Sequence, residues 1–219
     1  MPVDTKTPAV ANLIRQRFGT PQRLLVVGCG PGLEAAHLAE QLGSTVTGID
    51  VADTFDDEAR RRVDLRVGDG TALDFEDDSF DFVYCYHVLE HIPQYAIALS
   101  EMRRVMRPGA GYWIGTPNRR RLVGYIGSEG TSLAKKLAWN GADWKARLKG
   151  QFRNELGAHA GFTSQELRRI LISAFGNAEE TTREYYRAVY GSHGRALTVI
   201  ERSGLGRLVY PAVYFVGTA

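Results

Sequence analysis

The chain has few cysteines, almost no net charge and no long apolar run. Its two cysteines, Cys29 and Cys85, are far apart and give neither a disulfide framework nor zinc-site spacing. This favours a reducing, cytoplasmic location. Residues 1–17 lack the apolar core of a signal peptide, and no run of ~18 apolar residues predicts a transmembrane helix. A formal net charge of +2 gives no global reason to expect a nucleic-acid partner.

Short apolar runs alternate with helical patterns along the chain. Strands are expected at residues 24–27, 45–49, 63–67, 80–85, 112–115, 178–182 and 208–216, and helices at 8–18, 33–42, 97–106 and 164–172. Such alternation predicts an α/β fold with a doubly wound, mostly parallel sheet covered on both faces. The length of 219 residues favours a single domain spanning 1–219.

A glycine-rich turn, Gly28-Cys29-Gly30-Pro31-Gly32, joins the first expected strand to a helix. Glycines let backbone N–H groups approach a ligand closely, and the helix N-terminus adds partial positive charge. The third glycine comes one residue earlier than in the dinucleotide pattern G-x-G-x-x-G. The turn therefore suits a ligand without a pyrophosphate, such as S-adenosylmethionine (SAM).

Acidic residues end the next two expected strands. Asp50 follows the turn by about 20 residues, where a carboxylate can accept hydrogen bonds from both ribose hydroxyls. Asp69 precedes Gly70 and could accept a hydrogen bond from an adenine amino group, although an ordinary turn residue remains nearly as good an interpretation. In open parallel sheets ligands bind at the carboxyl ends of the strands, and these residues all fall there.

Four segments, VVGCGPG, VTGID, VGDGTALDFEDDSFDFVYCYHVLEH and MRPGAGYWIGTPN, stand in the order and spacing of a known family. Over residues 24–118, with a weaker similarity at 159–163, the chain resembles class I SAM-dependent methyltransferases. It is most similar to the small-molecule group that includes the ubiquinone and menaquinone methyltransferases. The resemblance implies SAM as cofactor and a Rossmann-like seven-stranded sheet whose last hairpin is antiparallel. The implied cofactor-binding residues are Gly28, Cys29, Gly30, Gly32, Asp50, Val51, Asp69, Gly70, Thr71 and Tyr86.

One position departs from the family pattern. The family usually has an acidic residue two positions before the first glycine, where it helps to hold the methionine amino group of SAM. This chain has Val26 there. Either another group replaces that contact or SAM binds more weakly.

Candidate catalytic residues follow the fourth expected strand, where the family places methyl transfer. His87, Glu90 and His91 lie here, and a helix would put the two histidines on one face. Histidine suits a general base near neutral pH, and Glu90 could orient it or bind a cation. A metal would need ligands from elsewhere and is not predicted, while a purely structural role for Glu90 and His91 remains open. His159 is a second candidate base, with a surface role as its alternative.

The segment from about 118 to 160 is predicted to be an inserted lid. Between 118 and 154 it holds nine Lys or Arg and two acidic residues, a net charge of +7. Arg119, Arg120 and Arg121 are candidate substrate contacts. Leu133, Leu137, Trp144 and Leu148 share one face if a helix persists through Asn140-Gly141, and we expect that face to pack on the domain. Covering an anionic or amphiphilic substrate, or contacting an anionic membrane, are the alternatives.

These features predict a SAM-dependent O-methyltransferase acting on a hydroxyl of a small or amphiphilic molecule. A sugar, glycolipid, phenol or polyketide would each fit. The basic insert raises a nucleic-acid methyltransferase as an alternative, although the chain has no appended RNA-binding module and no Pro-Pro-Tyr type motif. A non-catalytic SAM-binding protein is the other alternative, with slight support from Val26.

Overall fold

The computed structural model describes residues 6–125, 130–156 and 158–219. A seven-stranded sheet runs through its centre in the order β3-β2-β1-β4-β5-β7-β6. The first five strands are parallel to one another, and β7 is antiparallel to both of its neighbours, β5 and β6. The predicted doubly wound fold with an antiparallel last hairpin is therefore confirmed. The strands are β1 (Arg23–Val27), β2 (Thr45–Asp50), β3 (Asp64–Val67), β4 (Phe80–Tyr86), β5 (Met106–Pro117), β6 (Glu179–Glu180) and β7 (Ala212–Thr218).

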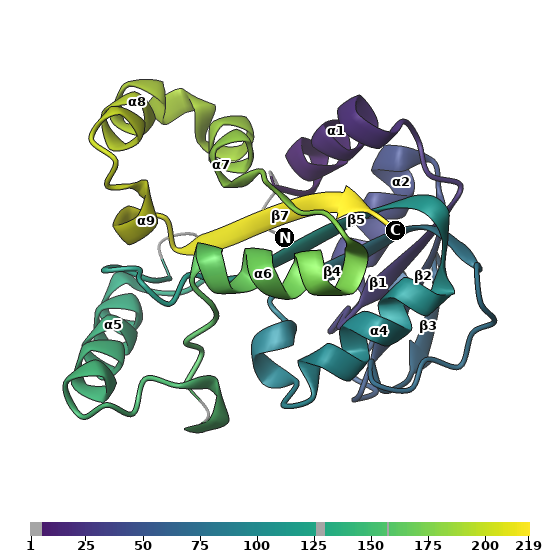
Figure 1. The fold of residues 1–219 in the computed structure, drawn as a ribbon, viewed down its shortest axis with the longest axis horizontal. Helices are drawn as coiled ribbons and strands as arrows, with labels where there is room; N and C mark the ends of the chain where they lie inside the picture. The colour runs from purple at the N-terminus through teal and green to yellow at the C-terminus, as the bar shows by residue number, and fades with distance from the viewer. Residues whose placement is uncertain (1–5, 126–129, 157) are drawn as a thin grey trace.

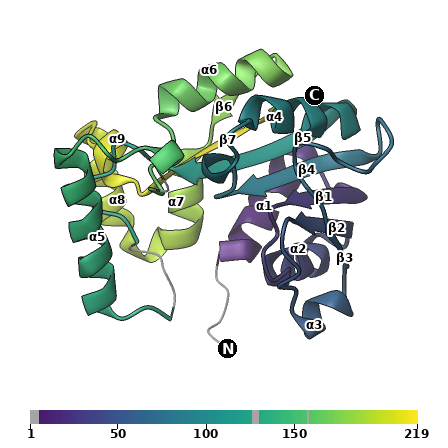
Figure 2. The same cartoon turned by 90° about the horizontal axis from the view of Figure 1, so that it is seen from below.

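Helices cover both faces of the sheet (Figures 1 and 2). One face carries α1 (Lys6–Phe18), α2 (Leu33–Leu42) and α7 (Thr182–Tyr190), and the other carries α4 (Tyr95–Val105) and α6 (Ser164–Phe175). The short helix α3 (Asp57–Arg60) precedes β3. Residues 24–27 of β1 are buried on both sides, which explains why this strand reads as a continuous apolar run rather than an alternating one.

Strand β5 begins earlier than the sequence predicts. The strand was expected at 112–115, after a helix at 97–106, yet β5 starts at Met106, directly after α4 ends at Val105, and so contains Pro108 and Gly109. Met106 pairs with Phe80, and the register then shifts before Phe82 pairs with Gly111. Because proline cannot donate a ladder hydrogen bond, a strand tolerates it at such an irregularity.

A helical segment between β6 and β7 was not predicted. Besides α7 it contains η3 (Gly191–His193), α8 (Gly194–Arg202) and α9 (Gly206–Val209). The strand expected at 178–182 is reduced to the two-residue β6, and the strand expected at 208–216 starts later, at Ala212, and runs on to Thr218. Tyrosine and valine within 185–190 favour strands by propensity, but burial of Tyr185 and Tyr186 against the sheet stabilises a helix instead.

The basic insert forms one continuous helix, α5 (Leu133–Leu148), that passes through Asn140-Gly141 and is followed by the short η2 (Asn154–Leu156). No residue of α5 is buried, and Leu133, Leu137 and Leu148 are 72%, 63% and 87% exposed. The expectation that this apolar side packs on the domain is therefore wrong. Other contacts attach the helix, among them the ion pair of Arg121 with Asp143 at 2.8 Å and the ring contact of Tyr125 with Trp139. Among the described residues, no helix has the length and apolar character needed to span a membrane.

The chain returns from the insert to the end of β5 at Gly161. Its φ is +71°, and a Cβ at this position would lie 1.8 Å from the carbonyl oxygen of Pro117. The Phe162 N–H donates to that same oxygen at 3.0 Å, and the Asn154 side chain bonds both the N–H and the carbonyl of Gly161. This close approach sets where His159, two residues earlier, can lie.

We predict that Gly161→Ala lowers the free energy of unfolding by about 2 kcal/mol or more, because it adds a backbone clash to the cost of a positive φ. Gly150→Ala is the matched control. Its φ is +67°, and a Cβ there would meet nothing within 4 Å, so it should cost only about 1 kcal/mol. Denaturant unfolding of both variants measures the difference, and equal losses would contradict the argument.

Candidate active site

The glycine turn is fastened to the end of β2. The N–H groups of Gly28 and Cys29 both donate to the carbonyl oxygen of Ile49, at 2.8 and 2.9 Å. The Gly30 N–H donates to one carboxylate oxygen of Asp50 at 2.8 Å, and the Ala52 N–H donates to the other at 3.2 Å. At Gly28 a Cβ would lie 2.1 Å from the Val88 side chain, so only glycine fits without rearrangement. The turn is thus pre-shaped by its own backbone contacts.

The space above this turn is open to a ligand. A Cβ on Gly30 would meet no heavy atom within 4 Å, and the side chain of Val51 is 74% exposed. Asp69 accepts hydrogen bonds from the N–H and the hydroxyl of Thr71, both at 2.8 Å, and these bonds lower the pKa of Asp69. An open glycine cradle beside two carboxylates suits a nucleoside with a short charged tail.

The chain leaves β4 through a strained turn. His87 has a φ of +56°, uncommon for a non-glycine residue, and its N–H donates to the carbonyl of Gly115 at 2.8 Å. The next residues form η1 (Leu89–His91), a short 3-10 helix that leaves His87 outside. His87 and His91 therefore do not share an α-helical face. Instead both approach Glu90, whose Oε1 lies 4.0 Å from His87 Nδ1 and 3.9 Å from His91 Nε2.

Burial changes the acid–base properties of this group. The Glu90 side chain is only 1% exposed, and burial raises its pKa to about 7. Burial, reinforced by the nearby positive Arg121, lowers the pKa of His87 to about 3. Neither carboxylate oxygen of Glu90, nor Nε2 of His87, has a hydrogen-bond partner among the described residues. Buried polar atoms without partners are rare and mark candidate functional sites.

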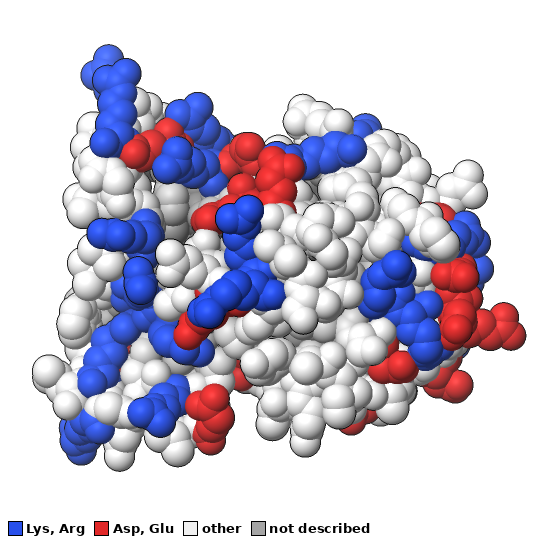
Figure 3. Space-filling model, viewed as in Figure 1, with Lys and Arg blue, Asp and Glu red and all other residues white. Residues whose placement is uncertain are grey.

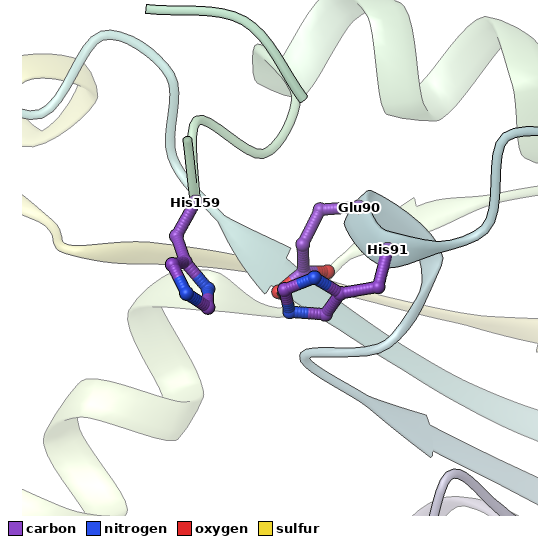
Figure 4. A group of neighbouring side chains, drawn as sticks. All are labelled: Glu90, His91 and His159. Carbon is purple, nitrogen blue, oxygen red and sulfur yellow. Dashed lines mark ion pairs between the residues drawn. The ribbon is translucent and has the colours of Figure 1, made fainter. Parts of the chain in front are cut away.

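His159 reaches the same place from the far side of the insert. Its ring lies 4.7 Å from that of His91, centroid to centroid, at an interplanar angle of 80°. One carboxylate oxygen of Glu90 and one ring nitrogen each of His91 and His159 all lie within 4.8 Å of one another (Figure 4). The structure thus brings together candidate residues separated by nearly 70 positions in the sequence.

The three candidate arginines are placed differently. Arg119 donates to the Gly161 carbonyl and pairs with Glu166 at 3.0 Å. Arg120 is exposed and lines a second hollow rather than the main cavity. Arg121 is 4% exposed, lines the main cavity, and donates to the His159 carbonyl at 2.9 Å. Arg119 and Arg121 thus hold the chain around residues 159–161.

A cavity of about 880 Å³ opens beside Tyr86, His87 and His159. Much of its wall comes from α7, α8 and the segment before β7. Neither these helices nor their part in a cavity was predicted from the sequence. Seven tyrosines contribute to it: Tyr86, Tyr125, Tyr185, Tyr186, Tyr190, Tyr210 and Tyr214. The repeat of tyrosine at 185, 186 and 190 has helical spacing and was the available signal for this wall.

These tyrosines hold one another in place. The rings of Tyr185 and Tyr214 stack with centroids 3.9 Å apart, and those of Tyr186 and Tyr210 with centroids 4.4 Å apart. Tyr86 stacks on Tyr214 at 5.9 Å. Aromatic pairs in such geometry add stability beyond their buried area. The cavity wall is therefore largely preformed.

The sequence is similar to those of known methyltransferases. The family model described as a methyltransferase domain matches residues 25–114. The chain is 31% identical over 179 residues to the ubiquinone biosynthesis O-methyltransferase of Pseudomonas fluorescens, covering 76% of this chain and 75% of that protein. It is 39% identical over 95 residues to the demethylmenaquinone methyltransferase of Staphylococcus aureus, covering 40% of this chain and 39% of that protein.

The fold is also similar to that of a solved methyltransferase structure. Phosphoethanolamine N-methyltransferase 2 of Haemonchus contortus, solved in complex with SAM, superposes with a TM-score of 0.59 at 20% identity. That match covers 95% of this chain and 52% of the other. The sheet order and the glycine cradle are those of a class I methyltransferase. The chain belongs to the class I SAM-dependent methyltransferase family, with SAM as its cofactor.

We predict that Asp50→Ala weakens the binding of S-adenosylhomocysteine (SAH) by about 10- to 100-fold, the worth of charged hydrogen bonds to a ligand and to the Gly30 N–H. Asp57→Ala, in the exposed first turn of α3, is the control and should leave the affinity unchanged. Calorimetric titration with SAH measures both. An unaltered affinity in Asp50→Ala would remove this residue from the cofactor site.

Proposed function

We propose that this methyltransferase transfers the methyl group of SAM to a hydroxyl on an aromatic, largely apolar small molecule. The observation that carries the proposal is the tyrosine-walled cavity of about 880 Å³ beside Tyr86 and His87. Ligand cavities of roughly 300–1,000 Å³ with mostly apolar walls typically take drug-sized molecules. A phenol or an aromatic polyketide matches these walls better than a sugar does, because tyrosine faces offer few hydrogen bonds.

The polar groups of the cavity lie where they can orient such a substrate. His87, Arg121 and His159 line it close to the end of β4, while Leu197 and Ile200 of α8, together with His193 just before that helix, line it elsewhere. In the proposed pose the acceptor hydroxyl points toward His87 and His159, and the apolar part of the molecule lies along Leu197 and Ile200. The names of the relatives that act in ubiquinone and menaquinone synthesis support a ring substrate of this kind.

The residues of this chain have three tasks in the proposed reaction. The glycine turn and Asp50 hold the cofactor, and the tyrosine wall positions the acceptor and excludes water. Bound SAM supplies an activated methyl group, whose bond to sulfur breaks, with the electron pair passing to sulfur, as the new oxygen–carbon bond forms. The acceptor hydroxyl must also lose its proton. Glu90, His91 and His159 are the groups placed to assist that loss.

The basic surface does not favour a nucleic-acid substrate over this one. Lysine and arginine side chains gather on the side formed by α5, α8 and α9 (Figure 3). Yet several cations of the insert are bound internally: Arg121 pairs with Asp143, and Arg147 donates to the carbonyls of Arg119 and Arg121. Part of the positive charge therefore holds the insert together.

We predict SAH production from SAM with hydroxylated aromatic compounds and little or none with sugars or RNA. Following SAH across a panel of phenols, catechols, sugars and RNA fragments measures this. Steady turnover only with sugars or RNA would contradict the proposed substrate class while leaving the methyltransferase assignment intact.

We predict that Ala196→Trp raises the KM for the aromatic acceptor at least about tenfold, because the indole fills cavity space next to Leu197. SAH affinity should not change. The control is Val199→Trp on the same helix, at a position 66% exposed, which should leave KM near the value of the unaltered protein. Equal effects of the two substitutions would argue against the acceptor binding in this cavity.

A further inference from the structure

We propose that Glu90, His91 and His159 form a site for one divalent transition-metal ion, with Zn²⁺ as the representative ion. Two imidazoles and one carboxylate make a ligand set that suits zinc, iron, cobalt or manganese and leaves coordination positions open. The metal-binding part stands without the proposed function, whereas the role of the ion in catalysis rests on it.

The buried carboxylate is the first observation. Glu90 is 1% exposed at its side chain, and neither of its oxygens has a hydrogen-bond partner among the described residues. Leaving a buried carboxylate unpaired costs several kcal/mol, in either protonation state, unless a partner is supplied. A bound cation would satisfy both oxygens.

The geometry of the two histidines is the second observation. His91 Nε2 lies 3.9 Å from Glu90 Oε1, and the ligand atoms of all three residues lie within 4.8 Å of one another (Figure 4). Ligands bonded to one ion at about 2.1 Å stand roughly 3–4 Å apart. His91 is half exposed and His159 is exposed, so both rings have room for the small rotations that close this gap.

The surrounding charges permit a cation here. Arg121 lines the same cavity as His159, and its guanidinium is paired with Asp143 at 2.8 Å and bonded to the His159 carbonyl. The positive charge of Arg121 is therefore already offset by Asp143.

The location gives such an ion a chemical use. His159 lines the tyrosine-walled cavity, so an open coordination position can face the acceptor. A metal-bound hydroxyl loses its proton far more readily than a free one. In this scheme the O–H bond breaks, the proton passes to water, and the oxygen stays on the metal as the nucleophile. The three side chains then act as ligands rather than as the base.

The experiment uses the untagged full chain, freed of metal by a chelator and dialysed. Calorimetry with Zn²⁺ and visible absorption with Co²⁺ should show one tight site, with Co²⁺ bands typical of low coordination number. Glu90→Gln, His91→Ala and His159→Ala should each weaken binding by about 100-fold or more, since each removes a ligand. His193→Ala, another histidine of the cavity wall, is the matched control and should bind as the unaltered protein does.

SAH affinity, measured on the same samples, shows that each variant is folded. Absence of stoichiometric binding, or binding that persists in all three ligand variants, overturns the site. If the metal site is overturned in this way while aromatic hydroxyls are still methylated, the metal proposal is wrong and the proposed function stands. If one ion binds through these ligands and no hydroxyl compound is methylated, the site stands and the proposed function fails.

Discussion

The parallel pairing of β1 with β2 and β4 is the constraint on which the rest of the molecule depends. Parallel strands end at the same edge of a sheet, so the glycine turn, Asp50 and His87 meet although they are up to about 60 positions apart. The hydrogen bonds from Gly28 and Cys29 to Ile49 then hold the turn to the neighbouring strand. Because both faces of the sheet are covered, this edge is where a ligand can reach backbone groups.

The sequence predicted this central part well for a physical reason. Fully buried strands such as β1 need uninterrupted apolar residues, and turns with positive φ favour glycine. Both features can therefore be recognised from the sequence alone. The candidate residues His87, Glu90 and His91 lie at the end of β4 as expected, because polar residues directly after a buried strand must lie at its end. Their arrangement around Glu90 was not predictable, since it depends on the 3-10 turn at Leu89–His91.

Prediction failed where tertiary contacts outweigh local preference. The segment 182–209 forms helices although its tyrosines and valines favour strands, because the sheet supplies the surface against which Tyr185 and Tyr186 pack. In α5 the failure was of the opposite kind. Its apolar spacing is real, but the helix is attached through Asp143, Arg147 and Trp139, and its exposed leucines Leu133, Leu137 and Leu148 stay uncovered. Periodicity alone does not show what a helix face meets.

Much of the tyrosine wall belongs to one continuous stretch of chain, 182–214, that lies outside the matched methyltransferase region of residues 25–114. That stretch leaves and rejoins the sheet at its last two strands, where β6 is only two residues long. Insertions or exchanges there need not disturb the parallel strands that form the cofactor edge. Under the proposed function, the acceptor-binding wall can therefore change while the strands that hold SAM stay as they are.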